Sequence, residues 1–181
     1  TVSMQILILL LTLLQSYCPS PTLTMMTFNI RYDNPRDGEN GWSHRKELVV
    51  ESIEQQKPSI IAIQEALPSQ LKFVLEHLDH FKAIGEPRDG ANSEFCGLLI
   101  DTSKLEVMES GQLWLSEKPK EKGSVGWDAA LTRTATWAKL KFVDSESQPF
   151  VVFGTHFDHK GIEARLESAK LIIQKATEIG S

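Results

Sequence analysis

Residues 150–159 join an uninterrupted apolar run to a cluster of ionisable side chains. The sequence Phe-Val-Val-Phe-Gly at 150–154 predicts a strand that is buried on both faces. His156, Asp158 and His159 follow almost at once. In α/β proteins, the loops that leave the carboxyl ends of strands carry the chemistry. This stretch is therefore the first candidate for a functional site.

Strand patterns alternate with helical patterns along the rest of the chain. A helix is expected over 44–56, with Ser43 as its N-cap and with Leu48, Val49 and Ile53 on its inner face. Further strands are expected at 24–30, 58–65, 81–85, 96–101, 105–109, 112–115 and 134–142. A long loop is expected at 116–132.

Two further helices complete the pattern. One is expected to start at Ser69, with an apolar stripe of Leu71, Val74, Leu75 and Leu78. The other covers 162–179, and its inner face is expected to consist of Leu166, Ala169, Ile172 or Ile173, and Ala176. This order of strands and helices favours an α/β sandwich, with mixed sheets inside and helices outside.

The composition restricts which partners the protein can bind more than it restricts the fold. The 181 residues are 41% hydrophobic and 24% charged, which is ordinary for a globular domain. A net charge of −5 argues against tight binding to long nucleic acid, because such binding requires a basic surface. A small phosphate ester remains compatible with this charge, particularly where a metal holds it.

The first eighteen residues resemble a secretory signal peptide. The apolar run at 5–14 is too short for a membrane span, which needs about 20 residues. Export to the periplasm or the medium is expected, with residues 19–181 forming the domain. No Lys or Arg precedes Arg31, so a buried N-terminal element in a cytoplasmic protein is the alternative. Cys18 would leave with the signal, and Cys96 is then expected to be a buried small hydrophobe.

Two polar residues close the first two expected strands. Asn29 ends one strand and Glu65 ends the next, and a helix joins the two. An amide oxygen and a carboxylate at neighbouring strand ends suit a hard cation such as Mg²⁺, which keeps several waters. With His156 at the end of another strand, the set is typical of a metal-assisted phosphoesterase.

These motifs resemble those of the endonuclease/exonuclease/phosphatase superfamily, which has the DNase I-like fold. This resemblance is carried by residues 27–31, 64–65 and 155–159. Within the superfamily, the chain is similar to a subset of exported bacterial-type hydrolases. That second likeness is carried by residues 31–34, 38–40, 114–116, 126–130 and 133. The resemblance implies a four-layer α/β sandwich with two mixed sheets and outer helices, incomplete in this chain.

The resemblance also implies a role for each motif residue at the metal end and at the histidine. Glu65 would be the principal ligand of Mg²⁺, or of Mn²⁺ as the alternative metal, and Asn29 would assist it and touch the substrate. His156 would hydrogen-bond the phosphate or act in an acid/base pair. Glu94 would orient His156, and Asp158 would buttress it or line the pocket.

Two further residues are implied on the substrate side. Arg133 would contact a phosphate oxygen, a task that suits a guanidinium fork. Trp127 would line the substrate site. The expected substrate is a small phosphate ester, either a monoester or a diester, and a secreted nuclease is the alternative within enzymes. The oligomeric state stays open.

Each of these residues also has a plain structural interpretation. Asn29 could cap a turn, and Glu65 could stabilise the start of a helix. His156 could be a satisfied core histidine, Asp158 a turn former and Trp127 a loop anchor. These interpretations weaken when taken together, because all of them must hold at once.

The chain departs from the superfamily pattern after the histidine motif. The resemblance implies a Gly-Asp-x-Asn segment, whose Asp activates the attacking water, and a later Asp-His pair. Neither occurs in the printed sequence. We therefore expect this chain alone to be nearly inactive, since general-base help is typically worth ~10²–10⁴-fold in rate. A noncatalytic phosphate- or partner-binding module is the alternative from another class.

Overall fold

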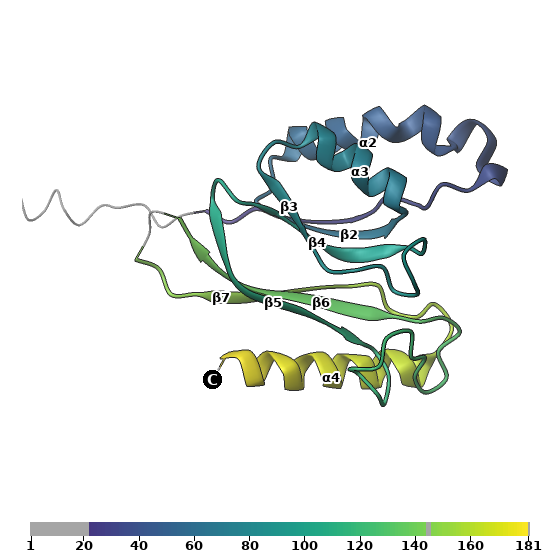
Figure 1. The fold of residues 1–181 in the computed structure, drawn as a ribbon, viewed down its shortest axis with the longest axis vertical. Helices are drawn as coiled ribbons and strands as arrows, with labels where there is room; N and C mark the ends of the chain where they lie inside the picture. The colour runs from purple at the N-terminus through teal and green to yellow at the C-terminus, as the bar shows by residue number, and fades with distance from the viewer. Residues whose placement is uncertain (1–21, 144–145, 181) are drawn as a thin grey trace, which may run out of the picture.

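The computed structural model describes residues 22–143 and 146–180 and forms four layers. Figure 1 shows α2 and α3 on one outer side, two stacked sheets in the middle and α4 on the other outer side. The elements in chain order are β1 (Met25–Asn29), the 3-10 helix η1 (Pro35–Asn40), α2 (Trp42–Gln56), β2 (Ile60–Ala66), α3 (Pro68–His77), β3 (Phe81–Ile84), β4 (Phe95–Asp101), β5 (Leu105–Trp114), β6 (Thr134–Phe142), β7 (Phe150–Thr155) and α4 (Ile162–Gly180).

The first sheet has the strand order β1-β2-β4-β3 and is mixed. β1 and β2 are parallel, while β4 pairs antiparallel with both β2 and β3. All seven residues of β4 are buried, because this strand is central in its sheet and the sheet is covered on both faces. The order of elements along the chain did not determine whether the first two strands are parallel. Because they are, the carboxyl ends of β1 and β2 lie at one edge of the sheet.

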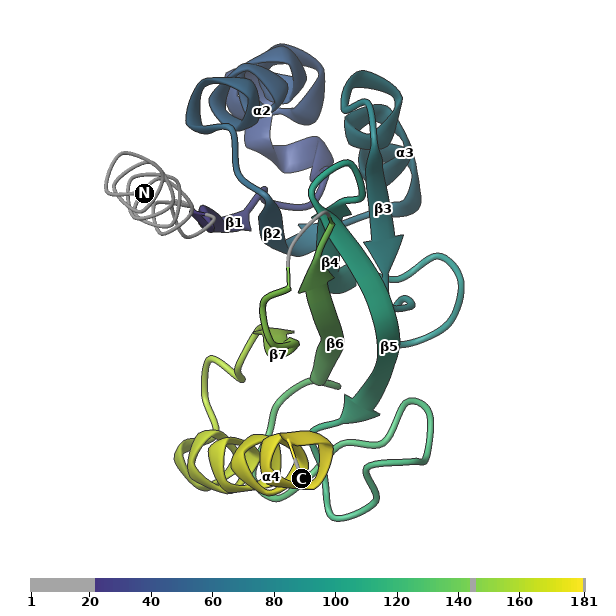
Figure 2. The same cartoon turned by 90° about the vertical axis from the view of Figure 1, so that its left-hand side faces the viewer.

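The second sheet has the order β5-β6-β7, and its described pairs are antiparallel. Figure 2 shows β1 and β7 on the same side of the two stacked sheets. Gly154 in β7 lies directly against the first sheet. A Cβ atom at this position would come within 2.9 Å of the Leu98 side chain and 3.2 Å of the carbonyl oxygen of Gly97. This close contact brings the end of β7 near the end of β2.

Three apolar clusters lie between the four layers. One packs α2 and α3 on the first sheet through residues such as Ile53, Ile63 and Val74. A second joins the two sheets, with Leu98 and Leu140 fully buried. A smaller third cluster packs the second sheet against α4. The free thiol of Cys96 is buried at the start of β4, as expected.

The predicted N-cap of one helix and the predicted start of another are both wrong. α2 begins at Trp42 after Gly41, so Ser43 lies inside the first turn rather than before it. α3 begins at Pro68, a residue that suits the first helical position because it lacks an N–H, so Ser69 is also internal. Leu48 was expected on the inner face of α2, but its exposed fraction is 60%.

The two strands expected at 105–109 and 112–115 form one strand, β5. Gly111, between the two expected strands, stays in the ladder opposite Trp137. Its lack of a side chain makes room for that ring, since a Cβ atom would lie 2.9 Å from the indole. The register of β5 against β6 shifts between Val107 and Glu109.

The predicted inner face of α4 is partly wrong. Leu166 and Ile173 are 57% and 66% exposed. The helix instead buries Ala164, Ser168 and Ile179, with Leu171 and Ile172 packed against the second sheet. The helix carries apolar residues on two faces, so the sequence pattern alone could not identify which face packs on the sheet.

The predicted signal peptide at residues 1–18 lies outside the described residues, so export stays a prediction. Within residues 22–143 and 146–180, no helix has both the length and the apolar character that a membrane span requires.

Candidate active site

A hydrogen-bonded pair of polar side chains lies where β1 and β2 end together. Asn29 Nδ2 donates to Glu65 Oε1 at 2.8 Å, and the Tyr32 N–H donates to Glu65 Oε2 at 3.2 Å. Asn29 Oδ1 in turn accepts the Arg31 N–H at 2.9 Å. The structure therefore brings together the two residues that the sequence predicted as metal ligands.

The backbone and the charge of Glu65 are both unusual. Its φ of 61° lies in the left-handed region, which non-glycine residues occupy at a cost. Burial opposes ionisation of its carboxylate, but the hydrogen bonds from Asn29 and Tyr32 outweigh burial and lower the pKa of Glu65. Glu65 is thus a half-buried carboxylate that stays ionised at neutral pH.

The buried side chain of Gln70 holds the loops that follow β1 and β2. Its Nε2 donates to the carbonyl oxygen of Arg31 at 2.9 Å. Its Oε1 accepts the N–H groups of Asp33 and Leu67, at 2.9 Å and 3.1 Å. Gln70 is not among the residues predicted from the sequence, where its one signal is a glutamine in the first turn of a helix beside a strand end.

A second missed residue, Arg45 on α2, also fixes the loop after β1. Its guanidinium donates to the carbonyl oxygens of Ile30 and Arg31, and its Nε donates to that of Asn40 at 3.0 Å. Three carbonyl oxygens of one polar loop are satisfied by a single side chain. The positions of Asn29 and Arg31 are therefore fixed from the helical layer as well as from the sheet.

His156 approaches Glu65 from the second sheet. Burial lowers the pKa of His156, and the charge of Arg133 lowers it further. The negative charge of Glu65 acts in the opposite direction, and the charge of a protonated His156 would in turn lower the pKa of Glu65. The ring makes no hydrogen bond to any residue that the structure describes. His156 is therefore a half-buried imidazole whose lowered pKa favours the neutral form, and the charge of the Glu65 carboxylate acts on it.

Asp158 holds Arg133 rather than His156. Its Oδ2 contacts Arg133 Nε at 3.4 Å and accepts the Leu131 N–H at 3.2 Å. Its Oδ1 accepts the N–H groups of Lys160 and Gly161, both at 2.9 Å. The prediction that Asp158 buttresses His156 is not borne out by a contact. The carboxylate is instead the fixed centre of a turn that orients a guanidinium.

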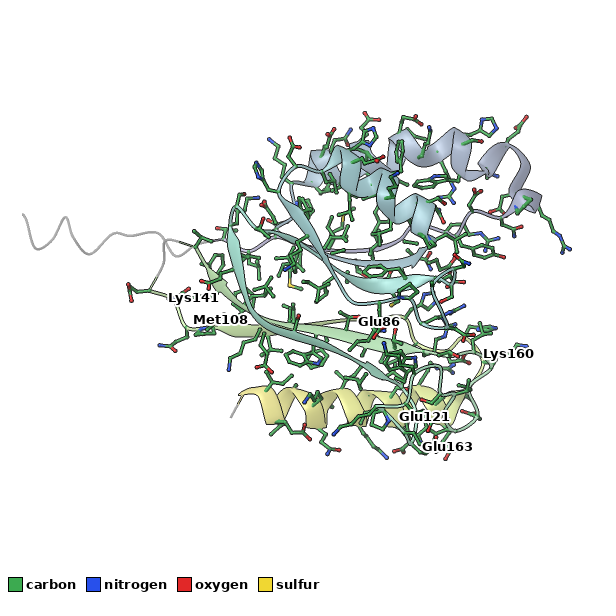
Figure 3. All side chains as sticks on the ribbon, viewed as in Figure 1. Glu86, Met108, Glu121, Lys141, Lys160 and Glu163 are labelled. Carbon is green, nitrogen blue, oxygen red and sulfur yellow. The ribbon has the colours of Figure 1, made fainter. Side chains whose placement is uncertain are left out.

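His159 also contacts the guanidinium of Arg133. Its Nδ1 lies 3.3 Å from Arg133 Nη2, although the sequence analysis gave His159 no role. Arg133 is 5% exposed, and the described contacts occupy its Nε and Nη2. Figure 3 shows the neighbouring Lys160 at the end of the molecule where the chain passes from β7 to α4.

Glu94 forms an ion pair with Arg88, at 3.0 Å between Oε1 and Nη2. Burial raises the pKa of Glu94, and the charges of Arg88 and Arg133 act against that rise. Within the described residues, no contact joins Glu94 to His156. Its predicted role in orienting the histidine therefore has no contact to support it here, and Arg88 is a further charged residue at the site that the sequence analysis missed.

Trp127 and Asp128 lie in the long loop before β6. The Trp127 N–H donates to both carboxylate oxygens of Glu117 at 3.2 Å, and no described contact links its ring to Glu65 or His156. Asp128 accepts the N–H groups of the first three residues of α4, at 2.7–3.3 Å. This loop therefore caps α4, and the substrate role of Trp127 stays a prediction.

The polar groups at the ends of β1 and β2 fit a hard cation only in part. Glu65 supplies an ionised carboxylate and Asn29 an amide oxygen, the oxygen ligands that Mg²⁺ prefers. Within the described residues, there is no group of three His, Cys, Asp or Glu side chains arranged to hold a metal. A cation at this place would rest on two protein ligands and on water.

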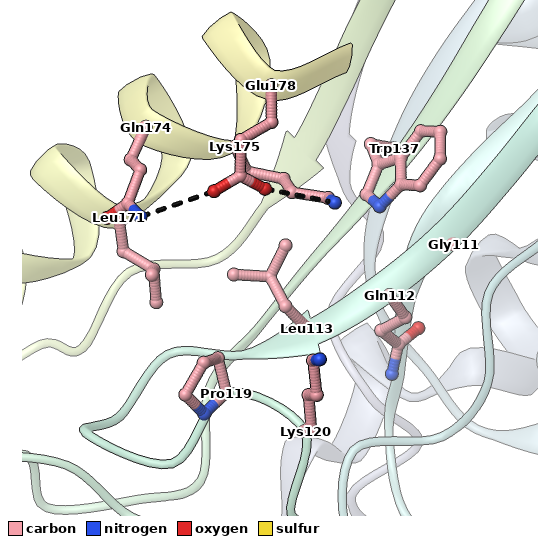
Figure 4. A pocket seen from close by; sticks show the side chains of 10 residues that line it. All are labelled: Gly111, Gln112, Leu113, Pro119, Lys120, Trp137, Leu171, Gln174, Lys175 and Glu178. Atoms are coloured by element: carbon pink, nitrogen blue, oxygen red, sulfur yellow. Dashed lines mark hydrogen bonds and ion pairs between the residues drawn. The ribbon is translucent and has the colours of Figure 1, made fainter.

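A pocket elsewhere in the molecule has no part in this arrangement. It has a volume of about 390 Å³ and lies between β5, β6 and α4. Figure 4 shows Trp137, Leu113 and Lys175 on its walls. None of the predicted site residues lines it, so its size does not make it the centre of the chemistry.

Comparison with solved structures gives close matches, whereas neither family models nor curated protein sequences gave any match. An endonuclease/exonuclease/phosphatase from Bacteroides vulgatus is 40% identical, with a TM-score of 0.80 over 87% of this chain. A mannosyl-6-phosphatase from Bacteroides thetaiotaomicron is 34% identical, with a TM-score of 0.82 over 88% of this chain. This chain covers 60% of the length of each of these proteins.

A more distant structure, a 2′,3′-cyclic phosphatase, shares the fold at 14% identity with a TM-score of 0.68. The sheets, the outer helices and the polar strand ends define a DNase I-like α/β sandwich. The chain belongs to the endonuclease/exonuclease/phosphatase superfamily, as its motifs indicated. It spans about 60% of the length of those two relatives.

Proposed function

We propose that this chain carries the metal-binding end and part of the phosphate-binding wall of a metal-dependent phosphate-ester hydrolase. One observation carries the proposal. Asn29 and Glu65 are hydrogen-bonded at the ends of two parallel strands, and the charge of Glu65 acts on the pKa of His156, which follows a strand of the other sheet. Its solved relatives include a mannosyl-6-phosphatase, which favours a small phosphate ester such as a sugar phosphate as substrate.

Each residue has a task that its surroundings support. Glu65 offers an ionised carboxylate, and Asn29 fixes the orientation of that carboxylate through its amide group. In its neutral form, His156 has one ring nitrogen that donates and one that accepts a hydrogen bond. It can therefore donate to a phosphate oxygen or hold a proton that the reaction releases.

Glu65 and Asn29 would hold Mg²⁺ or Mn²⁺. When bound, the cation supplies positive charge that stabilises the negative charge developing on the phosphate oxygens. Arg133 presents its guanidinium from the second sheet, held in place by Asp158. A fixed guanidinium binds phosphate oxygens with little loss of conformational freedom.

A noncatalytic phosphate-binding module is the second candidate. It is favoured by the lack, within the described residues, of a three-residue group that could hold a metal. In that case Arg133 and His156 would bind a phosphate group with no hydrolysis.

The test measures metal binding and hydrolysis separately, on this chain and on any longer product of the same reading frame. Mg²⁺ is titrated by calorimetry into the wild type, Glu65→Gln and the control Glu54→Gln, which changes an exposed carboxylate on α2. We expect Glu65→Gln to weaken Mg²⁺ binding about tenfold or more, as changes around metal ligands commonly do. The control should bind like the wild type.

Hydrolysis is then followed with mannose 6-phosphate, p-nitrophenyl phosphate, bis(p-nitrophenyl) phosphate and single-stranded DNA. Mg²⁺-dependent turnover of an ester that Glu65→Gln reduces roughly 100-fold or more would support the hydrolase. Full Mg²⁺ affinity in Glu65→Gln would show that the metal assignment is wrong. Phosphate binding without metal and without turnover, in every product tested, would favour the binding module.

A further inference from the structure

Arg88 is fixed as firmly as the site residues, although no motif includes it. It lies in the connection between β3 and β4, and its side chain is 14% exposed. Its N–H donates to the carbonyl oxygen of Glu94 at 3.1 Å, and its own carbonyl oxygen accepts from Trp114 Nε1 at 2.9 Å. Both backbone polar groups are satisfied, so the direction of the side chain is set by the fold.

The start of β4 lies against the start of β6, and this contact brings Arg88 toward Arg133. Thr136 Oγ1 donates to the carbonyl oxygen of Cys96 at 3.0 Å. Glu94 comes two residues before Cys96, and Arg133 comes three residues before Thr136. The ion pair between Arg88 and Glu94 therefore lies in the same part of the fold as Arg133, whose pKa the charges of both residues influence.

Two guanidinium groups that share a partly buried region repel each other. The charge of Arg88, after burial itself, lowers the pKa of Arg133, and it also lowers the pKa of His156. The nearby carboxylates of Glu94 and Asp158 offset part of this charge. A pair of like charges is kept in such a place at a cost, and an anionic ligand would remove that cost.

Both guanidinium groups have N–H donors that no residue in the described part of the chain accepts. A guanidinium has five N–H donors. The side chain of Arg88 uses Nη2 on Glu94, and Arg133 uses Nε on Asp158 and Nη2 on His159. No residue in the described part of the chain accepts from Nη1 of either arginine. The charges of both guanidinium groups also lower the pKa of His156.

We propose that Arg88 and Arg133 together form a two-arginine clamp for a terminal phosphate group, which makes the substrate a phosphomonoester. This inference rests on the proposed function and assigns its substrate class. A phosphomonoester carries a charge near −2 at neutral pH, because its second pKa is about 6, whereas a diester carries −1. It also presents three free oxygens, so two guanidinium forks and His156 can each bind one. A diester has two free oxygens and a second substituent to place.

Glu94 has a positioning role in this arrangement. It holds Arg88 through Nη2 and leaves Nε and Nη1 available to the ligand. Arg88 is thus a specificity-determining residue for the ester class, and Glu94 acts through Arg88.

The experiment compares methyl phosphate with dimethyl phosphate as ligands of the full chain, with and without Mg²⁺, by calorimetry at pH 7.5. The variants are Arg88→Gln, Arg88→Lys and the control Arg36→Gln, which removes an equal charge from an exposed position on η1. The unfolding temperature of each variant is measured in parallel. Arg88→Lys keeps the charge that pairs with Glu94, so it provides a folded variant if Arg88→Gln is unstable.

We expect the wild type to prefer methyl phosphate about tenfold or more, since a charge-assisted hydrogen bond has an effect of this size. Arg88→Gln should weaken methyl phosphate binding about tenfold and dimethyl phosphate binding about twofold or less. Arg88→Lys should keep part of the preference, and Arg36→Gln should keep all of it.

Three results would overturn the clamp. They are equal binding of both esters by the wild type, unchanged methyl phosphate affinity in folded Arg88 variants, and equal weakening of both esters. Mg²⁺ affinity at Glu65 is measured independently of these ligands. A failed clamp with intact Mg²⁺ binding would therefore leave the proposed hydrolase standing, while loss of the metal assignment would be recognised by itself.

Discussion

Glu65 and Asp158 are both carboxylates that lie where a core strand ends, yet their surroundings differ. Asp158 is 4% exposed and accepts hydrogen bonds from three backbone N–H groups and from Arg133. Glu65 is partly exposed and receives one hydrogen bond on each oxygen, from Asn29 and Tyr32. A carboxylate can accept about four hydrogen bonds. Donors of the protein therefore fill the hydrogen-bonding capacity of Asp158, whereas Glu65 can still interact with a ligand.

The difference separates a residue that builds the site from one that can act in it. The sequence alone assigned both carboxylates to the chemistry. In the structure, Asp158 closes the turn between β7 and α4 and fixes Arg133, while Glu65 faces the region that His156 shares. We expect changes at Asp158 to reduce stability most and changes at Glu65 to affect ligand binding most.

The largest expected effect is that of Asp158→Asn on stability. The amide cannot accept all of these hydrogen bonds, and it leaves the guanidinium of Arg133 buried without its counter-charge. Breaking a buried pair from one side costs roughly 3–5 kcal/mol. Urea unfolding followed by circular dichroism measures this loss. A loss below about 1 kcal/mol would contradict the structural role of Asp158.

The contrast between the two carboxylates can be made sharper with acid. Burial would raise the pKa of Asp158, but backbone hydrogen bonds, led by those from Gly161 and Lys160, hold it well below its ordinary value. A lowered folded-state pKa stabilises the native state above the unfolded value, about 3.9, and the benefit is lost as pH falls below it. The stability difference between wild type and Asp158→Asn should therefore be full at pH 6 and shrink steadily below about pH 4. A difference that does not change with pH would argue that Asp158 is not ionised in the native state.

The sequence predicted the layers and the meeting of Asn29 with Glu65 well, because both depend on local patterns. The continuous apolar runs predicted both strands, but only β4 is buried throughout, whereas β7 is buried only at Val152 and Gly154. Polar residues at strand ends identified Asn29, Glu65 and His156. The roles of Glu94 and Asp158 could not be predicted in this way. Which group each carboxylate contacts depends on how β4, β6 and β7 approach one another.

Gln70 and Arg88 were missed for the same reason. A glutamine inside a helix and an arginine in a hairpin have no local signal of function. Their contacts join segments that lie 26–39 residues apart in the chain. Only the assembled fold shows that Gln70 holds two strand-end loops and that Arg88 and Arg133 lie in the same part of the molecule.

Glu65→Gln tests the prediction that Glu65 contributes to ligand binding more than to stability. Its stability should change by less than about 1 kcal/mol, because the glutamine can still accept hydrogen bonds at a partly exposed position. Saturating Mg²⁺ should raise the unfolding temperature of the wild type and leave that of Glu65→Gln unchanged, since a ligand stabilises only the state that binds it. Thermal unfolding with and without Mg²⁺ measures both. A large loss of stability in Glu65→Gln without metal would remove the distinction between Glu65 and Asp158.

The smallest expected effect is that of Asn29→Ala, which tests whether Glu65 is positioned as well as charged. The change removes the 2.8 Å hydrogen bond to Glu65 Oε1 and frees the Arg31 N–H, but it leaves the carboxylate in place. Mg²⁺ affinity should fall about tenfold, the lower end of what loss of a supporting hydrogen bond causes. Asn29→Asp separates positioning from ligation, because it offers an oxygen ligand but cannot donate to Glu65. If Asn29→Asp binds Mg²⁺ as tightly as the wild type, Asn29 acts mainly as an oxygen ligand. If it binds as weakly as Asn29→Ala, the amide donor is what the site needs, and the open carboxylate depends on its neighbour for orientation.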